Sequence, residues 1–504
     1  MNAQVSRSSR SALTDAAGLI ATLVVASLAA LGPSPASSEP TTTPVLSPAN
    51  IKKEELLYQR ATQAYLWALP LLNMRAMKEG SEAKFGAGYN VLPIWKKRMS
   101  AATLVTTPNS DVIYAMGYLN LKSDGPMVIE APPRLQGILD DFWQRPIRMV
   151  EQYEGREWSG DVGLPGPDKG KGGKYLVLPP DYDGSIPTGY FTYRARTYGV
   201  FVFWRGFFQD PKQLDGPVKV MEQTKIYPLG KETSAKPMQF PDASGVPVNM
   251  LFPRDASAFD MIKRALDEEY VDPAEMDMRG MLAAIGIVKD QPFNPTAADR
   301  AILDKAAQRA LEMARWTLVE DLGRRPGGKW YSDRQWINIF PPSPGTPEWT
   351  TSTYTNIDIR AAFFSSAYST SPVMVLNVPG SGAKYPAAFK DADGDAFDGA
   401  RSYRLRLPAN IPAKLFWSVT VYDLDTMSGL QNGQPFPSLN QMDKPAANSD
   451  GSTDLYFAPS SPGAGKNWLA TVPGRAFWVG LRLYGPEQPF FDQSWKPGDV
   501  EKVK

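Results

Sequence analysis

The sequence has no histidine and no cysteine among its 504 residues. Without histidine it cannot form a Ser–His–Asp or Cys–His catalytic group, an imidazole general base, or a His-ligated zinc, copper or haem site. Without cysteine it has no disulfide, thiolate nucleophile, iron–sulfur cluster or lipoprotein attachment point. The chemistry that remains is that of carboxylates, Tyr, Lys, Ser and Arg, and of hard cations held by oxygen.

A large net charge is also missing. Lys and Arg number 54, and Asp and Glu number 53, which gives a net charge of +1. The chain has no basic stripe interleaved with aromatic residues, and such a stripe is typical of proteins that bind a nucleic-acid backbone. We therefore expect no nucleic-acid partner.

Turn-forming and aromatic residues are plentiful. The chain has 46 Pro and 41 Gly, with 21 Tyr, 22 Phe and 13 Trp. Frequent turns and many aromatic residues predict short strands rather than long helical bundles. Because 504 residues exceed the size of a single hydrophobic core, we expect two or three domains in a mainly β fold with a helical insert.

One long apolar run lies near the N-terminus. The run Ala16–Leu31 follows Arg7 and Arg10, and Ser34-Pro35-Ala36 offers a small-x-small cleavage site. This order predicts a secretory signal peptide over residues 1–36. An uncleaved membrane anchor is the alternative, although the run is short for a membrane-spanning helix. We expect a periplasmic or secreted bacterial protein that contacts a membrane only through an uncleaved leader.

The rest of the chain changes its periodicity several times. Residues 37–50 are rich in Pro, Thr and Ser, with too little apolar surface to fold, which predicts a flexible linker. Segments with apolar residues at three- and four-residue spacing then alternate with short β-branched or aromatic segments. The expected domains are an N-terminal helical segment at 51–100, a β-sandwich domain at 101–254, a helical insert at 255–325 and a second β domain at 326–504.

Two positions carry helix signals. Pro70 lies within an apolar helical pattern and predicts a kink or an end of that helix. Thr296, with Asp299 three residues later, predicts the start of another helix. This second helix has one apolar stripe that predicts packing against the β domains: Leu303, Ala307, Ala310, Leu311, Ala314 and Leu318.

Two strands near the C-terminus show a regular alternation. In 415–422 and 477–484 every second residue is apolar, which predicts a core face. The opposite faces mix aromatic rings with polar groups and fit either a second sheet or a binding surface. From the β segments we expect these ligand-binding residues: Trp417, Tyr422, Trp468, Arg482 and Tyr484. The alternative is that most of these large side chains are core or domain-interface residues.

Several motifs together resemble one known family pair. They are Thr107–Tyr114 (TPNSDVIY), Gly172–Pro180 (GGKYLVLPP), Ile285–Pro295 (IGIVKDQPFNP), Phe416–Asp423 (FWSVTVYD) and Leu481–Pro486 (LRLYGP). In this order they are similar to domain of unknown function 1254 followed by domain of unknown function 1214. The resemblance implies an N-terminal immunoglobulin-like β-sandwich, a helical segment, a C-terminal jelly-roll-like β-sandwich, and export in many bacterial members. It implies no agreed activity, and a fold alone does not supply one.

Asn109, Asp111 and Tyr114 lie in the most distinctive of these motifs. As catalytic residues, Asp111 would act as a general base or acid, and Tyr114 and Asn109 would donate to a substrate oxygen. As structural residues, Asn109 and Asp111 would fix a turn by bonding their own backbone. The sequence leaves both interpretations open.

The densest acidic cluster consists of Asp391, Asp393, Asp395 and Asp398. Alternate Asp side chains on a Gly-containing loop can converge on a hard cation, which makes this loop a candidate calcium site. The calcium-loop pattern is incomplete, because Gly399 and Ser402 occupy its ninth and twelfth positions and the bidentate Glu is missing. A solvated turn between strands is the alternative.

No motif supplies a nucleotide cofactor or a complete serine nucleophile. Ser381 and Lys384 fit a Ser-x-x-Lys pattern, but no Lys-Thr-Gly accompanies them. We favour an exported envelope protein that binds a glycan or small molecule in an aromatic-lined cleft between β domains. It needs no cofactor, apart from a candidate calcium ion in the acidic loop. A hydrolase or lyase that uses Asp, Tyr and Lys is the alternative, and a structural envelope protein is the third hypothesis.

Overall fold

Two pairs of packed β-sheets and a group of helices make up the described part of the chain, which in this computed structural model is residues 53–340 and 346–503. The predicted signal peptide at 1–36 and linker at 37–50 lie outside the described residues. About 26% of the residues are helical and about 26% are in strands, and none of the sheets in the described ranges is closed. The fold is therefore mixed helix and sheet, with a larger share of helix than the mainly β prediction.

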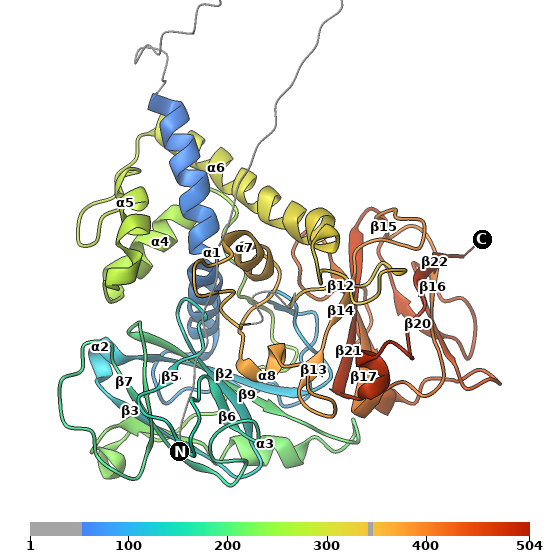
Figure 1. Cartoon of the computed structure of the whole chain (residues 1–504), viewed down its shortest axis with the longest axis horizontal. Helices are drawn as coiled ribbons and strands as arrows, with labels where there is room; N and C mark the ends of the chain where they lie inside the picture. Colours follow the sequence, from blue (N-terminus) through green and yellow to red (C-terminus); the bar gives the residue numbers. More distant parts are fainter. Residues whose placement is uncertain (1–52, 341–345, 504) are drawn as a thin grey trace, which may run out of the picture. The chain divides into compact units, whose positions relative to one another are not determined.

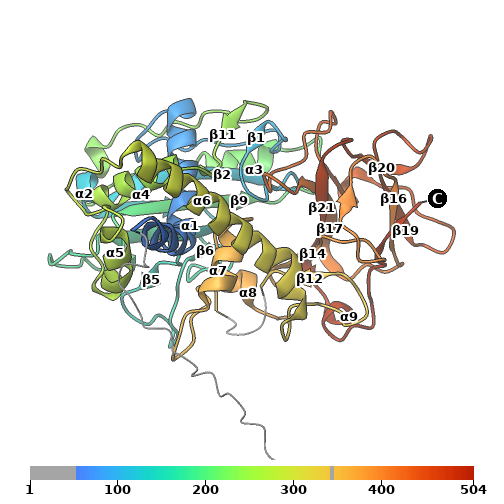
Figure 2. The ribbon, with the colours of Figure 1, turned by 90° about the horizontal axis from the view of Figure 1, so that it is seen from above.

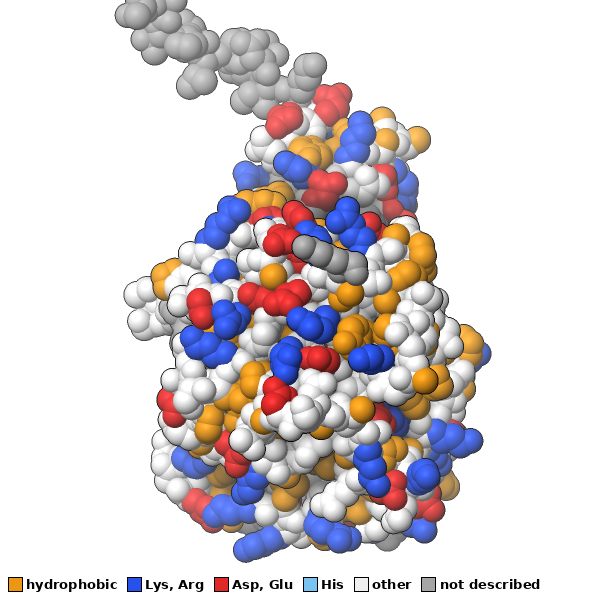
Figure 3. Space-filling model, turned by 90° about the vertical axis from the view of Figure 1, so that its right-hand side faces the viewer, with side chains coloured by type: hydrophobic (Ala, Val, Ile, Leu, Met, Phe, Trp, Pro, Cys, Tyr) orange, Lys and Arg blue, Asp and Glu red, His pale blue; other side chains and the backbone are white. Residues whose placement is uncertain are grey.

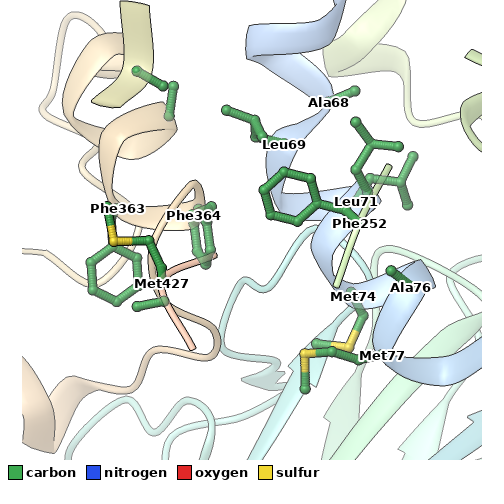
Figure 4. Packing of buried hydrophobic residues seen from close by; sticks show 14 of the residues in the cluster. Ala68, Leu69, Leu71, Met74, Ala76, Met77, Phe252, Phe363, Phe364 and Met427 are labelled. Atoms are coloured by element: carbon green, nitrogen blue, oxygen red, sulfur yellow. The ribbon is translucent and has the colours of Figure 1, made fainter. Parts of the chain in front are cut away.

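The long helix α1 (Lys53–Phe85) explains much of this difference, because it runs for 33 residues. It packs against four other helices: α4 (Ser257–Glu268), α5 (Met276–Ala283), α6 (Ala297–Trp316) and α7 (Ile357–Phe364). Figures 1 and 2 show α6 and α7 close to α1. In Figure 4, Leu69 and Met74 of α1 lie on the same side as Phe252, and Phe363 of α7 lies near Met427. All of these residues belong to one hydrophobic cluster.

Helix α1 continues through Pro70 as far as Phe85, so Pro70 does not end it. A proline inside a helix removes one backbone donor and crowds the preceding turn. Here Pro70 is buried within the helical group, and its carbonyl oxygen accepts a hydrogen bond from Gln144 Nε2 at 2.8 Å. Burial and this tertiary bond offset the local penalty, which the sequence pattern alone could not show.

The predicted start of helix α6 is confirmed. Thr296 is the N-cap residue, and its side chain accepts a hydrogen bond from the backbone N–H of Asp299 at 3.1 Å. The Asp299 carboxylate accepts in return from the backbone N–H of Thr296 at 3.3 Å, which completes a capping box. The predicted apolar stripe of this helix, which continues to Leu318, is buried in the same cluster as α1.

The first β region consists of two sheets. One has the order β10-β3-β7-β8-β5 and the other the order β2-β9-β4-β6. Their inner faces share one hydrophobic cluster, so the two sheets pack face to face. The strands are β2 (Ile113–Asn120), β3 (Met127–Ala131), β4 (Gln136–Asp141), β5 (Arg148–Met149), β6 (Asp161–Gly163), β7 (Gly173–Leu178), β8 (Phe191–Arg194), β9 (Gly199–Gly206) and β10 (Lys225–Pro228).

The second β region is built in the same way. Its larger sheet follows the path β12-β14-β21-β17-β18, with β13 and β15 also paired to β21, and its smaller sheet has the order β20-β19-β16-β22. One hydrophobic cluster joins the inner faces. The strands are β12 (Ile337–Asn338), β13 (Ala383–Lys384), β14 (Pro386–Ala388), β15 (Phe397–Asp398), β16 (Tyr403–Leu407), β17 (Ala413–Asp423), β18 (Ser438–Asn440), β19 (Thr453–Ala458), β20 (Asn467–Ala470), β21 (Ala476–Pro486) and β22 (Val500–Lys502).

The central strands of both regions have two buried faces. In β17 and β21 the predicted apolar sides, including Val419 and Leu481, fill the core between the sheets, whereas Leu415 is 56% exposed. Their other sides face the helical group, and so does one side of β2 and β9. We call this shared cluster the central core; from the strands it contains Tyr114, Met116, Tyr118, Phe201, Phe203, Phe416, Tyr422, Trp478 and Tyr484. The second faces of the two β regions therefore meet at the central core.

The remaining elements are short. They are β1 (Thr103–Leu104), β11 (Val248–Asn249), α2 (Leu121–Asp124), α3 (Asp215–Met221), α8 (Pro372–Val375), α9 (Gln488–Phe491) and a few single turns. Within the described ranges, no helix has both the length and the apolar character needed to cross a membrane. The face in Figure 3 carries acidic and basic side chains side by side rather than in patches of one sign.

Candidate functional site

A cavity lies where the second faces of the two β regions meet. About 60 Å³ of it is open to the centres of water-sized molecules, and about 500 Å³ is empty when the space up to its mouth is included. The lining comes from β2 and β9, from β21, and from the segment that connects α7 to α8. Several distant parts of the sequence therefore form one concave surface.

Arg205 is the most unusual residue of the lining. It is only 8% exposed, and among the described residues no hydrogen-bond acceptor or carboxylate partner binds its guanidinium. Its Nε atom is buried without any partner. A guanidinium is always charged in proteins, and a buried charge is normally paired. Arg205 therefore presents an unpaired positive charge to the cavity.

Arg482 supplies a second guanidinium, and this one is held by the protein. Its Nη1 donates to Thr420 Oγ1 at 3.0 Å and its Nη2 donates to the carbonyl oxygen of Pro108 at 3.2 Å. The guanidinium carbon lies 5.5 Å from the ring centroid of Tyr422, a favourable cation–π distance. Arg482 is 4% exposed and still contributes to the cavity wall.

Tyrosine hydroxyls surround the two guanidiniums. Asn109 Nδ2 donates to the hydroxyl oxygen of Tyr114 at 3.0 Å and to that of Tyr484. Because both hydroxyls accept from Asn109, the hydrogen of each is left for another acceptor. Burial raises the pKa of Tyr114, Tyr368 and Tyr484, so these hydroxyls stay protonated at neutral pH. The polar part of the site therefore consists mainly of hydrogen-bond donors.

The rest of the lining is apolar. It consists of Phe203, Ile339, Phe340, Phe363, Ala367 and Met374. Phe203 stacks on Tyr114 with ring centroids 4.9 Å apart, and Phe340 packs against Phe363 at 4.8 Å. The cavity thus combines a cationic, donor-rich part with an aromatic and aliphatic part.

Two buried carboxylates support the wall at Ser369. Asp140 accepts hydrogen bonds from Ser369 Oγ at 2.9 Å and from the backbone N–H of Thr370 at 3.2 Å. Asp161 accepts from the backbone N–H of Val373 at 3.1 Å. Burial raises the pKa of Asp140, and it raises the pKa of Asp161 to about 7. These side chains fix the segment that carries Tyr368 and Ser369 into the lining.

Asp111, the predicted general base, lies outside the cavity lining and is fully buried. Its carboxylate accepts from Ser438 Oγ at 2.9 Å, from Asn440 Nδ2 at 2.9 Å and from Arg98 Nη2 at 3.4 Å. Its backbone N–H donates to Asn109 Oδ1 at 2.8 Å. Asp111 therefore joins the chain segment before β2 to strand β18 and helps to hold Asn109 in place.

The predicted aromatic binding residues are spread over several environments. Trp417 lies in the core between the two sheets of the second β region, and Trp468 Nε1 donates to the carbonyl oxygen of Ala458 at 2.9 Å. Tyr422 is buried in the central core and donates to the carbonyl oxygen of Pro108 at 2.8 Å. Of the five predicted binding residues, the structure brings Arg482 to the cavity, with Tyr484 bonded to its wall.

Three of the four predicted metal-ligating carboxylates converge, with one oxygen each from Asp391, Asp393 and Asp395 within 4.8 Å of one another. The ammonium of Lys502 lies among them, 3.1 Å from Asp391, 3.0 Å from Asp393 and 2.6 Å from Asp395. Asp398 instead accepts from the backbone N–H of Ala400 at 2.9 Å. Lys502 thus supplies a positive charge where a bound cation would be expected.

Lys384 lies beside the cavity wall. It is 3% exposed, and its ammonium donates to the carbonyl oxygen of Met374 at 3.2 Å. No carboxylate forms a salt bridge with it within the described part of the chain. Burial lowers the pKa of Lys384 to about 8, so a fraction of this amine is uncharged at neutral pH.

Arg205, Tyr368 and Tyr385 line the cavity, although no sequence motif marks them as site residues. One feature of the sequence does point to Arg205. It is the charged end of the otherwise apolar run 200–205, and a charge at the end of a buried strand needs a partner. Tyr368 and Tyr385 follow no recognisable pattern. Only the pairing of distant segments brings them to the cavity.

Comparisons with known proteins agree with this architecture. Residues 89–228 match the family described as protein of unknown function (DUF1254), and residues 382–488 match protein of unknown function (DUF1214). Comparison with curated proteins gives no match.

Two solved structures are similar to the chain. The VPA0106 protein from Vibrio parahaemolyticus is 18% identical with a TM-score of 0.51, over 89% of this chain and all of that one. An uncharacterized protein from Burkholderia cenocepacia is 13% identical with a TM-score of 0.39, over 89% of this chain and 94% of that one. The first of these shows a shared fold alone. Both family matches are therefore present on the chain, with DUF1254 before DUF1214, as the sequence resemblance predicted.

Proposed function

We propose that the protein binds a small molecule in the cavity between its two β regions. The observation that carries this proposal is the buried guanidinium of Arg205, which has no acceptor among the described residues. Burying a charge without a partner destabilises a protein. Such a charge is therefore expected where a bound ligand supplies the missing partner. The convergence of polar groups on an otherwise apolar cavity is typical of small-molecule sites.

The lining favours binding over acid–base catalysis. A general acid or base must lie within hydrogen-bond reach of the substrate. Among the described residues, no Asp or Glu lines the cavity. Asp111 is already bonded to Ser438, Asn440 and Arg98. We therefore place a binding role before a catalytic one.

A thermal-shift screen of the purified protein tests this proposal. The screen contains oligosaccharides, murein fragments, small organic acids and inorganic phosphate, each applied to the wild type and to two variants. Arg205→Met removes the unpaired cation, and Arg404→Met is the matched control, because Arg404 lies outside the cavity, is partly exposed and pairs with Glu501 at 2.9 Å. A ligand at a hundred times its dissociation constant adds about 2.7 kcal/mol of stability.

We expect a shift of several degrees for the wild type and the Arg404 variant, and none for the Arg205 variant. Equal shifts in all three proteins would place the ligand elsewhere. The absence of any shift in the wild type would instead favour the structural envelope role.

The predicted export and the finer fold assignment also belong to this proposal. Export is supported by the order of charged, apolar and small residues over 1–36. Cell fractionation, with the mass of the mature protein, tests export and leader cleavage together.

Two packed sheets in each region support an immunoglobulin-like first region and a jelly-roll-like second region. An experimental structure tests both by its strand connections.

A hydrolase or lyase is the second candidate, and Lys384 is the observation that favours it. A buried amine with a pKa of about 8 can act as a base or a nucleophile near neutral pH. Turnover of any ligand found in the screen, measured with wild type and with Lys384→Met, decides between the two functions. Binding without turnover in both proteins rejects the enzyme.

A further inference from the structure

We infer that the ligand of the cavity is a monocarboxylate with an apolar body, such as an aryl or alkyl acid. This inference rests on the proposed binding function and adds the chemical class of the ligand. Three features support it: the positive charge in the cavity, the charged hydrogen-bond donors, and the apolar side chains of the lining.

The charged groups that line the cavity are hydrogen-bond donors. Arg205 and Arg482 carry only N–H groups, and the hydroxyl of Tyr114 already accepts from Asn109. The acceptor atom of Asn109 is in use, because Oδ1 accepts from the backbone of Asp111. The hydroxyl groups of Ser369 and Thr107 are the exceptions, because they donate to Asp140 and to the carbonyl oxygen of Ser366 and can only accept from a ligand. The charged donors are the two guanidinium groups, and an ionised acid complements them.

The charges around the cavity fit a ligand with one negative charge. The guanidinium of Arg482 is stabilised by the protein itself, through hydrogen bonds to Thr420 Oγ1 and to the carbonyl oxygen of Pro108 and through the ring of Tyr422. Asp161 forms no salt bridge with Arg205 in the described ranges, and burial raises the pKa of Asp161 to about 7, so this carboxyl group is only partly ionised at neutral pH. Arg205 therefore has a positive charge without a paired carboxylate, and a monoanion balances it.

A carboxylate suits these donors better than a phosphate does. Phosphate sites in proteins are commonly formed by free backbone N–H groups at helix N-termini or in Gly-rich turns. Here the backbone N–H of Ser369 donates to Gln144 Oε1 at 2.6 Å, and that of Thr370 donates to Asp140. The planar fork of a guanidinium matches the two oxygens of a carboxylate.

The apolar part of the lining favours an apolar body for the ligand. Phe203, Phe340 and Phe363 with Met374 offer ring faces and a flexible thioether to an apolar group. A sugar would place hydroxyl groups against these side chains and leave them without partners. The glycan expected as one alternative from the sequence is therefore less suited to this cavity than an aryl or alkyl acid.

Calorimetric titration with matched ligand pairs tests the inference. Benzoate is compared with benzyl alcohol, hexanoate with hexanol, and benzoate with acetate and inorganic phosphate. We expect benzoate and hexanoate to bind, with the alcohols and acetate weaker by at least about tenfold, because each lacks either the charge or the apolar body. Arg205→Met is expected to weaken benzoate at least about 30-fold, and Arg205→Lys to retain part of the affinity.

The outcomes separate this inference from the proposed function. Binding of phosphate, an oligosaccharide or an alcohol with an Arg205-dependent affinity would leave the binding function in place and reject the carboxylate class. Equal affinity for acetate and benzoate would reject the apolar body. If no compound binds, or if Arg205→Met binds benzoate as tightly as the wild type while it is folded by circular dichroism, both the inference and the proposed function are wrong.

Discussion

Arg205 lies directly opposite Tyr114 in the antiparallel pairing of β9 with β2, and its guanidinium carbon is 5.9 Å from the centroid of the Tyr114 ring. The same ring stacks on Phe203, two residues before Arg205 on β9. Strand pairing thus fixes the cation, the hydroxyl and the aromatic wall relative to one another. This part of the proposed site therefore belongs to the sheet.

Replacing Arg205 by methionine is expected to leave the protein as stable as the wild type, or more stable by about 1 kcal/mol. The reason is that a buried unpaired charge is exchanged for an apolar side chain of similar length. Arg482→Met is the comparison within the same cavity, because it removes two hydrogen bonds, and a loss of about 2 kcal/mol is expected. Urea unfolding of the three proteins measures both effects. A large loss of stability in Arg205→Met would mean that the protein itself pairs this charge.

Asp111→Asn is expected to destabilise the protein by about 3 kcal/mol, because it removes a buried charge paired with Arg98. Asp443→Asn is the control, since Asp443 contacts the same guanidinium at 3.5 Å from a partly exposed position. There we expect a loss of under about 1 kcal/mol. If Asp111→Asn kept its melting point and lost only binding or activity, Asp111 would have the catalytic role considered from the sequence.

Stability is expected to fall as the pH rises from about 4 to about 7. Burial raises the pKa of Asp161 and of Glu269 to about 7 in the folded protein, above the ordinary values of 3.8 and 4.5. The folded state therefore binds more protons than the unfolded state across this interval. The stabilisation that comes from these two carboxyl groups is complete below their unfolded pKa values, and it is lost as the pH rises through about 7. Asp161→Asn should flatten part of this decline in urea unfolding series, and an unchanged profile would show that Asp161 titrates normally.

Calcium is expected to have no effect on the melting point of the wild type, because the ammonium of Lys502 already lies among the three carboxylates. In the Lys502→Met variant the carboxylates lose this partner. We then expect a higher melting point in the presence of calcium than in the presence of a chelator. Lys496→Met, which removes a pair between Lys496 and Asp333, is the control without a calcium response. Stabilisation of the wild type by calcium would show that the loop binds metal despite Lys502.

The local elements of the fold could be predicted from the sequence, but the composition of the cavity could not. The capping pair Thr296 and Asp299 and the alternation in 415–422 are local patterns, and the structure contains both. The central core depends on which faces of distant strands meet. Arg482 was predicted from its strand face, whereas Tyr385 and Tyr368 reach the cavity only through tertiary packing. No local pattern could show that Arg205 lacks a partner, because this requires knowledge of every neighbour.

Whether Arg205 holds the ligand can be decided by measuring the affinity of benzoate for the wild type and for Arg205→Met in parallel calorimetric titrations, with Arg404→Met as the control. We expect binding to the wild type and to the Arg404 variant, and binding weaker by at least about 30-fold in the Arg205 variant. Equal affinity in all three proteins would show that the unpaired guanidinium of Arg205 has no part in holding the ligand.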